Sequence, residues 1–148
     1  ELLAAQASEQ PCVLPRVTAS NHHFGGVLVL EDDPELREMI AYEIRGTGRK
    51  LISSVDGASA RSLIEATPER FELAIVEHDA RIESGSEIAR LLSERCPGIG
   101  IVLLTTQPGV GIRGLAAGAR LFEIAKPFGV MELREALHEL TVSRPTPA

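Results

Sequence analysis

The feature that most constrains this chain is a short apolar run that ends in three acids and a proline. Val27–Leu30 is too short to span a membrane and is typical of a strand buried on both faces of a parallel sheet. Glu31, Asp32 and Asp33 follow it, and Pro34 then suits the first position of a helix, where no N–H donor is needed. In open α/β sheets, ligands bind at the carboxyl ends of the strands. An acidic cluster there predicts a divalent-cation site or repulsion of anions, unless a cation lies opposite.

Segments of strand-like composition alternate along the chain with segments whose apolar residues recur at helical spacing. We expect strands at 27–30, 51–55, 73–76, 101–104 and 120–124. We expect helices at 35–44, 58–66, 87–96 and 130–140, with a weak helix at 112–117, where glycines are frequent. These alternations predict one α/β domain of the (βα)5 flavodoxin-like type, a doubly wound parallel sheet with strand order 2-1-3-4-5.

Composition narrows the classes of function. The 148 residues carry a formal charge of −6, which argues against nucleic-acid binding because phosphate contacts need a basic face. Apolar runs are too short for a membrane span and two cysteines make no disulfide framework, so we expect a cytoplasmic segment without membrane contact. We expect residues 1–26 to be a linker or the end of an upstream domain, residues 27–141 the folded domain, and residues 142–148 a C-terminal tail.

Polar side chains follow four of the five predicted strands. Glu31 and Asp32 follow the first strand and Glu77 the third, whereas Thr105 ends the fourth and Lys126 follows the fifth. Each residue alone has a structural explanation, such as a helix cap, a turn residue or a surface charge. Because parallel strands end at one edge of the sheet, we expect all five side chains to converge in one crevice.

With these residues in place, the chain resembles a response-regulator receiver domain of two-component signalling over about residues 27–140. The resemblance implies that Glu31 and Asp32 bind Mg²⁺ and that the residue after the third strand accepts phosphate from a histidine kinase. It also implies that Thr105 and Lys126 contact the phosphoryl group and that the Lys126–Pro127 bond is cis. The matching segments are 27–34, Asp56-Gly57, 73–76, 101–105, 117–119 and Lys126-Pro127-Phe128.

A weaker resemblance concerns the start of the chain. Cys12–Val17 resembles the last strand of a histidine-kinase ATPase domain, which precedes a linker. This implies the C-terminal receiver of a hybrid histidine kinase, and a disordered linker is the alternative. The chain begins at Glu1 rather than at a methionine, so we expect a piece of a longer protein.

The chain departs from the receiver pattern at the phosphate acceptor, because Glu77 stands where the family has aspartate. The family places a glycine eight residues after the acceptor, and Gly85 lies eight residues after Glu77. The family's proline four residues after the acceptor is replaced by Arg81. Asp79 is the alternative acceptor, although its spacing to Gly85 is two residues short.

Glutamate at this position favours a receiver that works without phosphorylation. Its extra methylene carries the Glu77 carboxylate outward, toward Thr105 and Lys126, where a standing charge partly imitates a phosphoryl group. We expect Lys126 rather than Mg²⁺ to compensate the clustered acids, so that Mg²⁺ binding is weak or absent. The domain would then be biased toward its active-like arrangement.

The favoured function is therefore a protein-interaction and regulatory module, not an enzyme, with a histidine kinase or other signalling protein as partner. A homodimer is left open. One alternative is a receiver phosphorylated at Asp79, or inefficiently at Glu77. Another is a flavodoxin-like enzyme that binds a small ligand, which is disfavoured because an acidic loop follows the first strand in place of a glycine-rich one.

Overall fold

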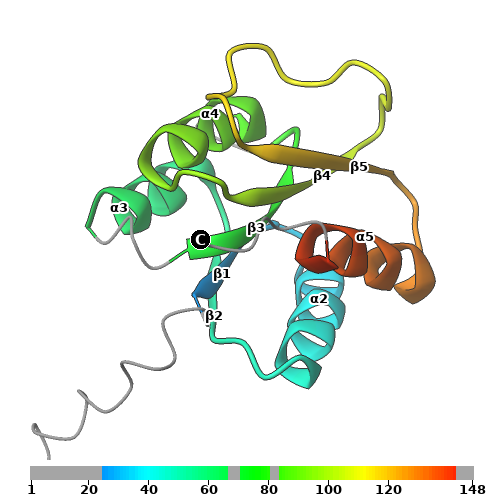
Figure 1. Cartoon of the computed structure of the whole chain (residues 1–148). Coiled ribbons are helices and arrows are strands. Elements are labelled where there is room, and N and C mark those ends of the chain that lie inside the picture. The colour runs from blue at the N-terminus through cyan, green and yellow to red at the C-terminus, as the bar shows by residue number, and fades with distance from the viewer. Residues whose placement is uncertain (1–24, 67–70, 81–83, 143–148) are drawn as a thin grey trace, which may run out of the picture.

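The computed structural model describes residues 25–66, 71–80 and 84–142. Of the features expected from the sequence, most of the 1–26 segment with Cys12–Val17, Arg81 and nearly all of the 142–148 tail lie outside these residues. The described part is a five-stranded sheet with helices on both faces (Figure 1). Among the described helices, none has the length and apolar character needed to cross a bilayer.

The sheet is parallel throughout, and its strand order β2-β1-β3-β4-β5 confirms the predicted topology. This order places β1 beside β3, so their carboxyl ends are neighbours. The strands are β1 (Gly26–Leu30), β2 (Leu51–Ser54), β3 (Phe71–Glu77), β4 (Gly100–Thr105) and β5 (Arg120–Ala125). The helices are α2 (Pro34–Gly46), α3 (Gly57–Ala66), α4 (Gly85–Arg95) and α5 (Val130–Val142).

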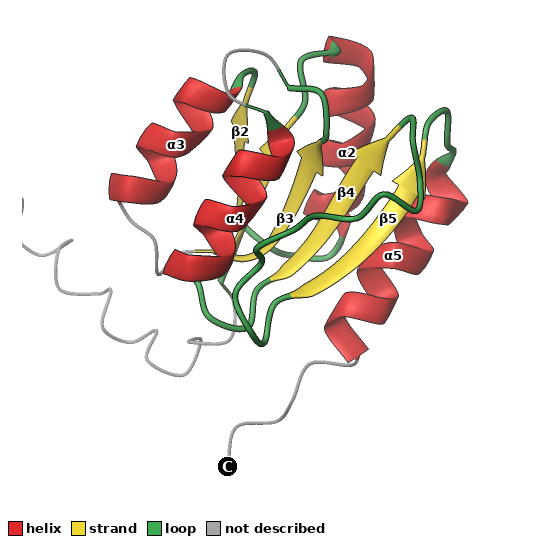
Figure 2. Cartoon of the chain, turned by 90° about the horizontal axis from the view of Figure 1, so that it is seen from above, coloured by secondary structure: helices red, strands yellow, loops and turns green. Residues whose placement is uncertain are grey.

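Helices α3 and α4 cover one face of the sheet, whereas α2 and α5 cover the other (Figure 2). Side chains along β1 point alternately to the two faces of the sheet. Leu28 and Leu30 pack in the core under α3 and α4, whereas Val27 and Val29 pack in the core under α2 and α5. All four side chains are fully buried. The near-continuous apolar strands expected for a doubly wound sheet are therefore present.

Local signals set the starts of two helices that flank the carboxyl edge. Asp33 caps α2, because its side chain accepts hydrogen bonds from the backbone N–H groups of Glu35 and Leu36, with Pro34 next in the chain. Ser84 caps α4 in a capping box with Glu87. Of the acids that follow β1, Asp33 is therefore the one that caps α2.

The expectation of a weak helix at 112–117 is wrong. Residues 106–119 contain no helix or strand and form a long loop between β4 and β5 (Figure 1, yellow). The glycines explain the difference, since Gly109, Gly111, Gly114 and Gly118 all have positive φ, which no right-handed helix contains. Ile112 and Leu115 still pack against the core under α4.

Candidate functional site

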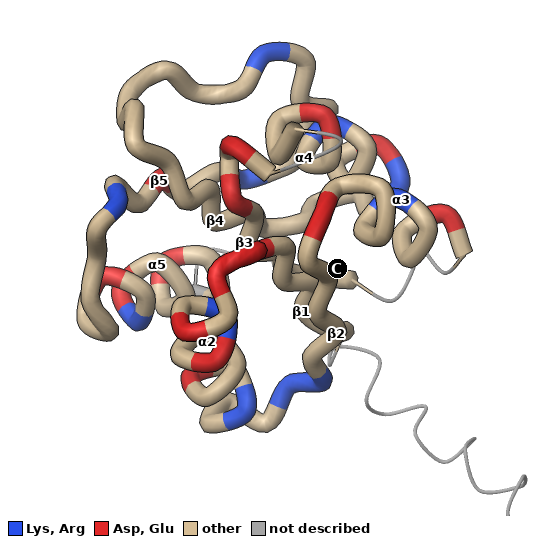
Figure 3. Tube along the Cα trace, turned by 180° about the vertical axis from the view of Figure 1, so that it is seen from behind, with Lys and Arg blue, Asp and Glu red and all other residues tan. Residues whose placement is uncertain are grey.

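The carboxyl edge of the sheet gathers side chains from three strand ends. Glu31 and Asp32 follow β1, Glu77 ends β3, and Lys126 follows β5. Carboxylate oxygens of the three acids all lie within 4.8 Å of one another. Figure 3 shows acidic stretches of the chain together between the end of β3 and the start of α2. The predicted convergence of these acids is therefore present.

Burial distinguishes the three acids. Glu31 is fully buried and Glu77 nearly so, whereas Asp32 is exposed. Oε2 of Glu31 accepts the backbone N–H of Asp33 at 3.0 Å, and Arg37 donates to the carbonyl oxygen of Glu31 at 2.8 Å. Burial first, and then the neighbouring Glu77 carboxyl group, raise the pKa of Glu31 to about 7. The innermost acid therefore holds a proton more tightly than an ordinary glutamate.

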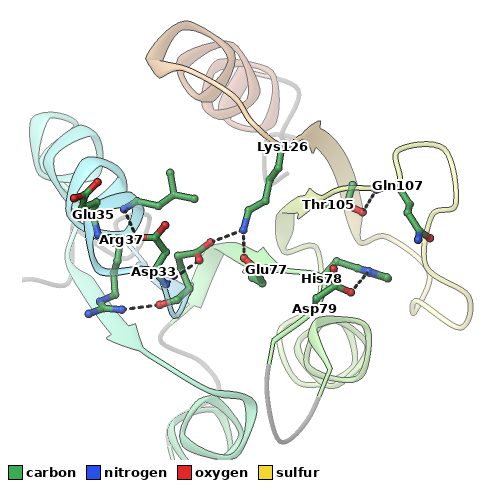
Figure 4. Close-up of polar contacts among 11 residues, drawn as sticks. Asp33, Glu35, Arg37, Glu77, His78, Asp79, Thr105, Gln107 and Lys126 are labelled. Carbon is green, nitrogen blue, oxygen red and sulfur yellow. Dashed lines mark hydrogen bonds and ion pairs between the residues drawn. The ribbon is translucent and has the colours of Figure 1, made fainter.

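Lys126 supplies the positive charge at the centre of the site. Its Nζ donates to Oε1 of Glu77 and lies 3.3 Å from Oε1 of Glu31 (Figure 4). Although partial burial works against the ammonium form, the hydrogen bond to Glu77 and the charges of both carboxylates raise the pKa of Lys126 above its usual value. The Lys126–Pro127 bond is cis, as the resemblance to receiver domains implies.

Thr105 reaches the same edge but its hydroxyl is turned to the following loop. The side chain is buried, and its Oγ1 accepts the backbone N–H of Gln107 at 2.9 Å (Figure 4). Backbone pairing does hold Thr105 next to Lys126, whose N–H donates to the Thr105 carbonyl at 2.8 Å. The structure thus brings the two residues together through their backbones and directs the hydroxyl elsewhere.

Asp79, the alternative acceptor, lies outside the carboxylate cluster. Its side chain is largely exposed, and its Oδ1 is 3.3 Å from Nδ1 of His78. A Cβ on Gly85 would overlap the carbonyl group of Glu77, and the Gly85 N–H donates to the His78 carbonyl at 3.0 Å. The glycine spacing therefore has a physical cause that ties Gly85 to Glu77, because α4 begins directly against the end of β3.

The three clustered carboxyl groups could bind a small divalent cation, but Lys126 also contacts them. Carboxylate oxygens, as offered by Glu31, Asp32 and Glu77, are the ligands that Mg²⁺ prefers. However, the Lys126 ammonium already contacts one oxygen of Glu77 and one of Glu31. The Lys126 ammonium thus supplies one positive charge from the chain itself to these acids.

A cavity of about 740 Å³ lies at the opposite edge of the sheet, between the C-terminal ends of α2 and α5, and has no contact with this cluster. A second cavity, of about 530 Å³, adjoins the cluster and combines acidic with apolar lining. Its lining residues are Asp33, Glu35, Leu36, Met39, Thr106, Lys126, Pro127 and Phe128.

Sequence reasoning missed two contributors to this edge, Arg37 and Glu123. Arg37 binds the Glu31 backbone, and Glu123 on β5 accepts hydrogen bonds from the loop after β4. Neither contact follows from strand or helix periodicity, because each depends on the conformation of a loop or of a long side chain.

Comparison with known proteins agrees with this fold and edge. No protein-family model matches the chain. The chain is 31% identical over 109 residues to TcrX of Mycobacterium tuberculosis, described as a probable transcriptional regulatory protein, covering 72% of this chain and 45% of that protein. It is 29% identical over 112 residues to the two-component response regulator-like APRR5 of Arabidopsis thaliana, covering 73% and 20% respectively. The chain thus spans less than half the length of either relative.

Solved structures match over nearly their whole length. The receiver domain of the sensor histidine kinase PA1611 from Pseudomonas aeruginosa, with a magnesium ion in its active-site cleft, is 25% identical at a TM-score of 0.62, with 80% of this chain and 99% of that chain covered. A response regulator receiver protein from Sinorhizobium medicae aligns at a TM-score of 0.69 and 18% identity, covering 82% and 97%. CheY4 of Vibrio cholerae aligns at 0.66 and 23%, covering 79% and 98%.

The fold and its carboxyl edge define the class as a flavodoxin-like α/β domain. The chain is a response-regulator receiver domain of two-component signalling.

Proposed function

We propose that this receiver domain acts without phosphorylation, as a protein-interaction and regulatory module. The observation that carries the proposal is the ion pair between Lys126 and Glu77, the residue at the family's acceptor position. The same ammonium group lies 3.3 Å from Glu31, so one positive charge of the chain lies against two of the clustered acids. One positive charge offsets the cluster only in part, but it lowers the need for a metal ion and engages the lysine that a phosphoryl group would contact.

The length of glutamate supports this proposal. Transfer of a phosphoryl group needs an in-line carboxylate oxygen, and a displacement of about 1 Å can lower the rate on the order of a hundredfold. The Glu77 carboxylate lies one methylene further from its backbone than an aspartate would, against Lys126. Its single negative charge imitates only part of a phosphoryl group, which carries about −1.5 to −2 at neutral pH.

We propose that Mg²⁺ binds weakly or not at all. Glu31, Asp32 and Glu77 are the residues that would hold it, and a bound ion would supply a divalent charge to neutralise the carboxylates. Lys126 competes for the same oxygens at every metal concentration because it belongs to the chain.

The partner that we propose is a signalling protein such as a histidine kinase. The cavity beside the site offers an apolar surface of Leu36, Met39 and Phe128 next to the charged edge, which suits contact with an amphipathic protein surface. One matched structure is named as the receiver domain of a sensor histidine kinase, and a hybrid-kinase context for this chain is part of the proposal. A second copy of the domain is the competing occupant.

Binding of a phosphoryl analogue tests the proposal. Amide spectra of ¹⁵N-labelled protein would be recorded with Mg²⁺ alone and with Mg²⁺ plus beryllofluoride, for the wild type and for Glu77→Asp. We expect beryllofluoride to shift the Lys126 and Gln107 amides in Glu77→Asp but not in the wild type. Equal shifts in both proteins would contradict the proposal, because the wild-type site would then accept a phosphoryl-like group.

A further inference from the structure

The loop between β4 and β5, residues 106–119, is held by side chains in place of a helix. Its central turn requires glycines, since Gly109 and Gly111 have φ of 94° and 70°. Both of their N–H groups donate to one carboxylate, that of Glu123 on β5, at 2.6 Å to Oε1 and 2.8 Å to Oε2. One side chain therefore fixes two points of the loop that lie two residues apart.

The distal part of the loop is attached to α4. Ser93 Oγ accepts the Ala116 N–H at 2.9 Å, and Arg90 donates to the Arg113 carbonyl at 3.2 Å. These contacts hold the far end independently of Glu123. The short stretch from Thr105 to Gly111 is consequently the part whose position depends on the Glu123 carboxylate.

Thr105 lies at the start of this stretch, and its hydroxyl accepts the Gln107 N–H. Gln107 is only two residues from Gly109, so the clamp at Gly109 restricts where the Gln107 N–H can lie. For its hydroxyl to turn toward Lys126 and Glu77, Thr105 would have to release that N–H. Lys126 is thus already paired with Glu77, whereas the Thr105 hydroxyl is bonded to the loop.

We propose that Glu123 is a positioning residue that acts through this loop to hold the Thr105 hydroxyl away from Lys126 and Glu77. This role of Glu123 extends the proposed function. It rests on that function in one point only, that the Thr105 hydroxyl belongs to the site. Under it, the domain keeps a fixed, half-assembled arrangement, with a lysine–carboxylate pair formed and a hydroxyl withheld by the β5 carboxylate.

The side-chain rotamer of Thr105 tests this proposal directly. Three-bond couplings from the Thr105 methyl carbon to its backbone nitrogen and carbonyl carbon report χ1, and would be measured in the wild type, Glu123→Ala and Glu123→Gln. Glu132→Ala is the matched control, because Glu132 also accepts a glycine N–H, that of Gly129, at 2.9 Å but lies at the start of α5. Glu123→Gln keeps the side-chain shape and can still accept with one oxygen, so it serves if the alanine variant unfolds.

We expect the wild type and Glu132→Ala to show one Thr105 rotamer and Glu123→Ala to show averaged couplings. Amide exchange at Gln107, Gly109 and Gly111 should accelerate by roughly tenfold or more in Glu123→Ala, with a smaller change in Glu123→Gln. Unchanged Thr105 couplings despite faster loop exchange would overturn the positioning role, and unchanged loop exchange would overturn the clamp itself. Neither measurement uses a phosphodonor or metal, so failure of this inference is distinguishable from failure of the proposed function.

Discussion

The ammonium group of Lys126 pairs with the carboxylate of Glu77, 49 residues earlier in the chain. The pair joins the ends of β5 and β3 over the buried Glu31, which contacts the same ammonium. Both partners are mostly shielded from water, so their attraction is screened less than that of a surface pair. Among the described residues, Lys126 is therefore the cation that directly pairs with the buried carboxyl groups of the receiver edge.

Removing that lysine should destabilise the domain and open the site to cations. We expect Lys126→Gln to lower the free energy of unfolding by about 1–3 kcal/mol, because partly buried carboxylates lose a charged hydrogen-bond donor. Urea unfolding measures the change, and Mg²⁺ titration of the same variant should show tighter binding than the wild type. Arg45→Gln is the control, since it breaks the exposed pair with Glu38 within α2 and should cost much less. Equal losses in both variants would contradict a special role for Lys126.

The raised pKa of Glu31 predicts a pH dependence of stability. Because the folded protein holds this proton up to a pKa of about 7, against an ordinary value of 4.5, its contribution is fully present below pH 4.5 and is lost as the pH rises through 7. Urea unfolding between pH 4.5 and 8 should therefore show a decline in the wild type that is missing from Glu31→Gln. Parallel pH profiles for the two proteins would show that Glu31 titrates normally.

Gly85 should be intolerant of a side chain. A Cβ there would overlap the carbonyl group of Glu77, so we expect Gly85→Ala to destabilise the domain by about 1–3 kcal/mol and to displace the acid at the end of β3. Gly46→Ala, at the last residue of α2 where no atom beyond its chain neighbours and the helix's own nearby backbone lies within 4 Å of the added Cβ, should be neutral or stabilising by up to about 1 kcal/mol. Thermal unfolding of the two variants checks the contrast, and similar melting temperatures would refute it.

The sheet was predictable because its three central strands, β1, β3 and β4, are buried on both faces and each gives way abruptly to polar residues. The run that ends at Glu77 and the run that ends at Glu31 have to lie side by side in a 2-1-3-4-5 sheet, so their acids meet. The pairing of Lys126 with Glu77 was predictable for the same reason, because β5 ends at the same edge of the sheet as β3. Strand register thus determines which residues come together at the site.

The loop after β4 was not predictable in the same way. Apolar spacing suggested a helix at 112–117, but glycine conformations and the Glu123 carboxylate determine its path. The direction of the Thr105 hydroxyl depends on that path, and so it could not be derived from the end of a strand. We expect the amide protons of 109–118 to exchange faster than those of 73–76, except at Gly109, Gly111 and Ala116, whose N–H groups donate to side chains.

Intact mass after incubation with Mg²⁺ and a small phosphodonor tests the central claim most directly. The account predicts that the wild type gains no phosphoryl mass, while Glu77→Asp gains one because it restores the family's acceptor in an otherwise similar site. Asp79→Asn separates the two possible acceptors, since an adduct lost in that variant would lie on Asp79. A stoichiometric phosphoryl adduct on the wild-type protein would contradict phosphorylation-independent function.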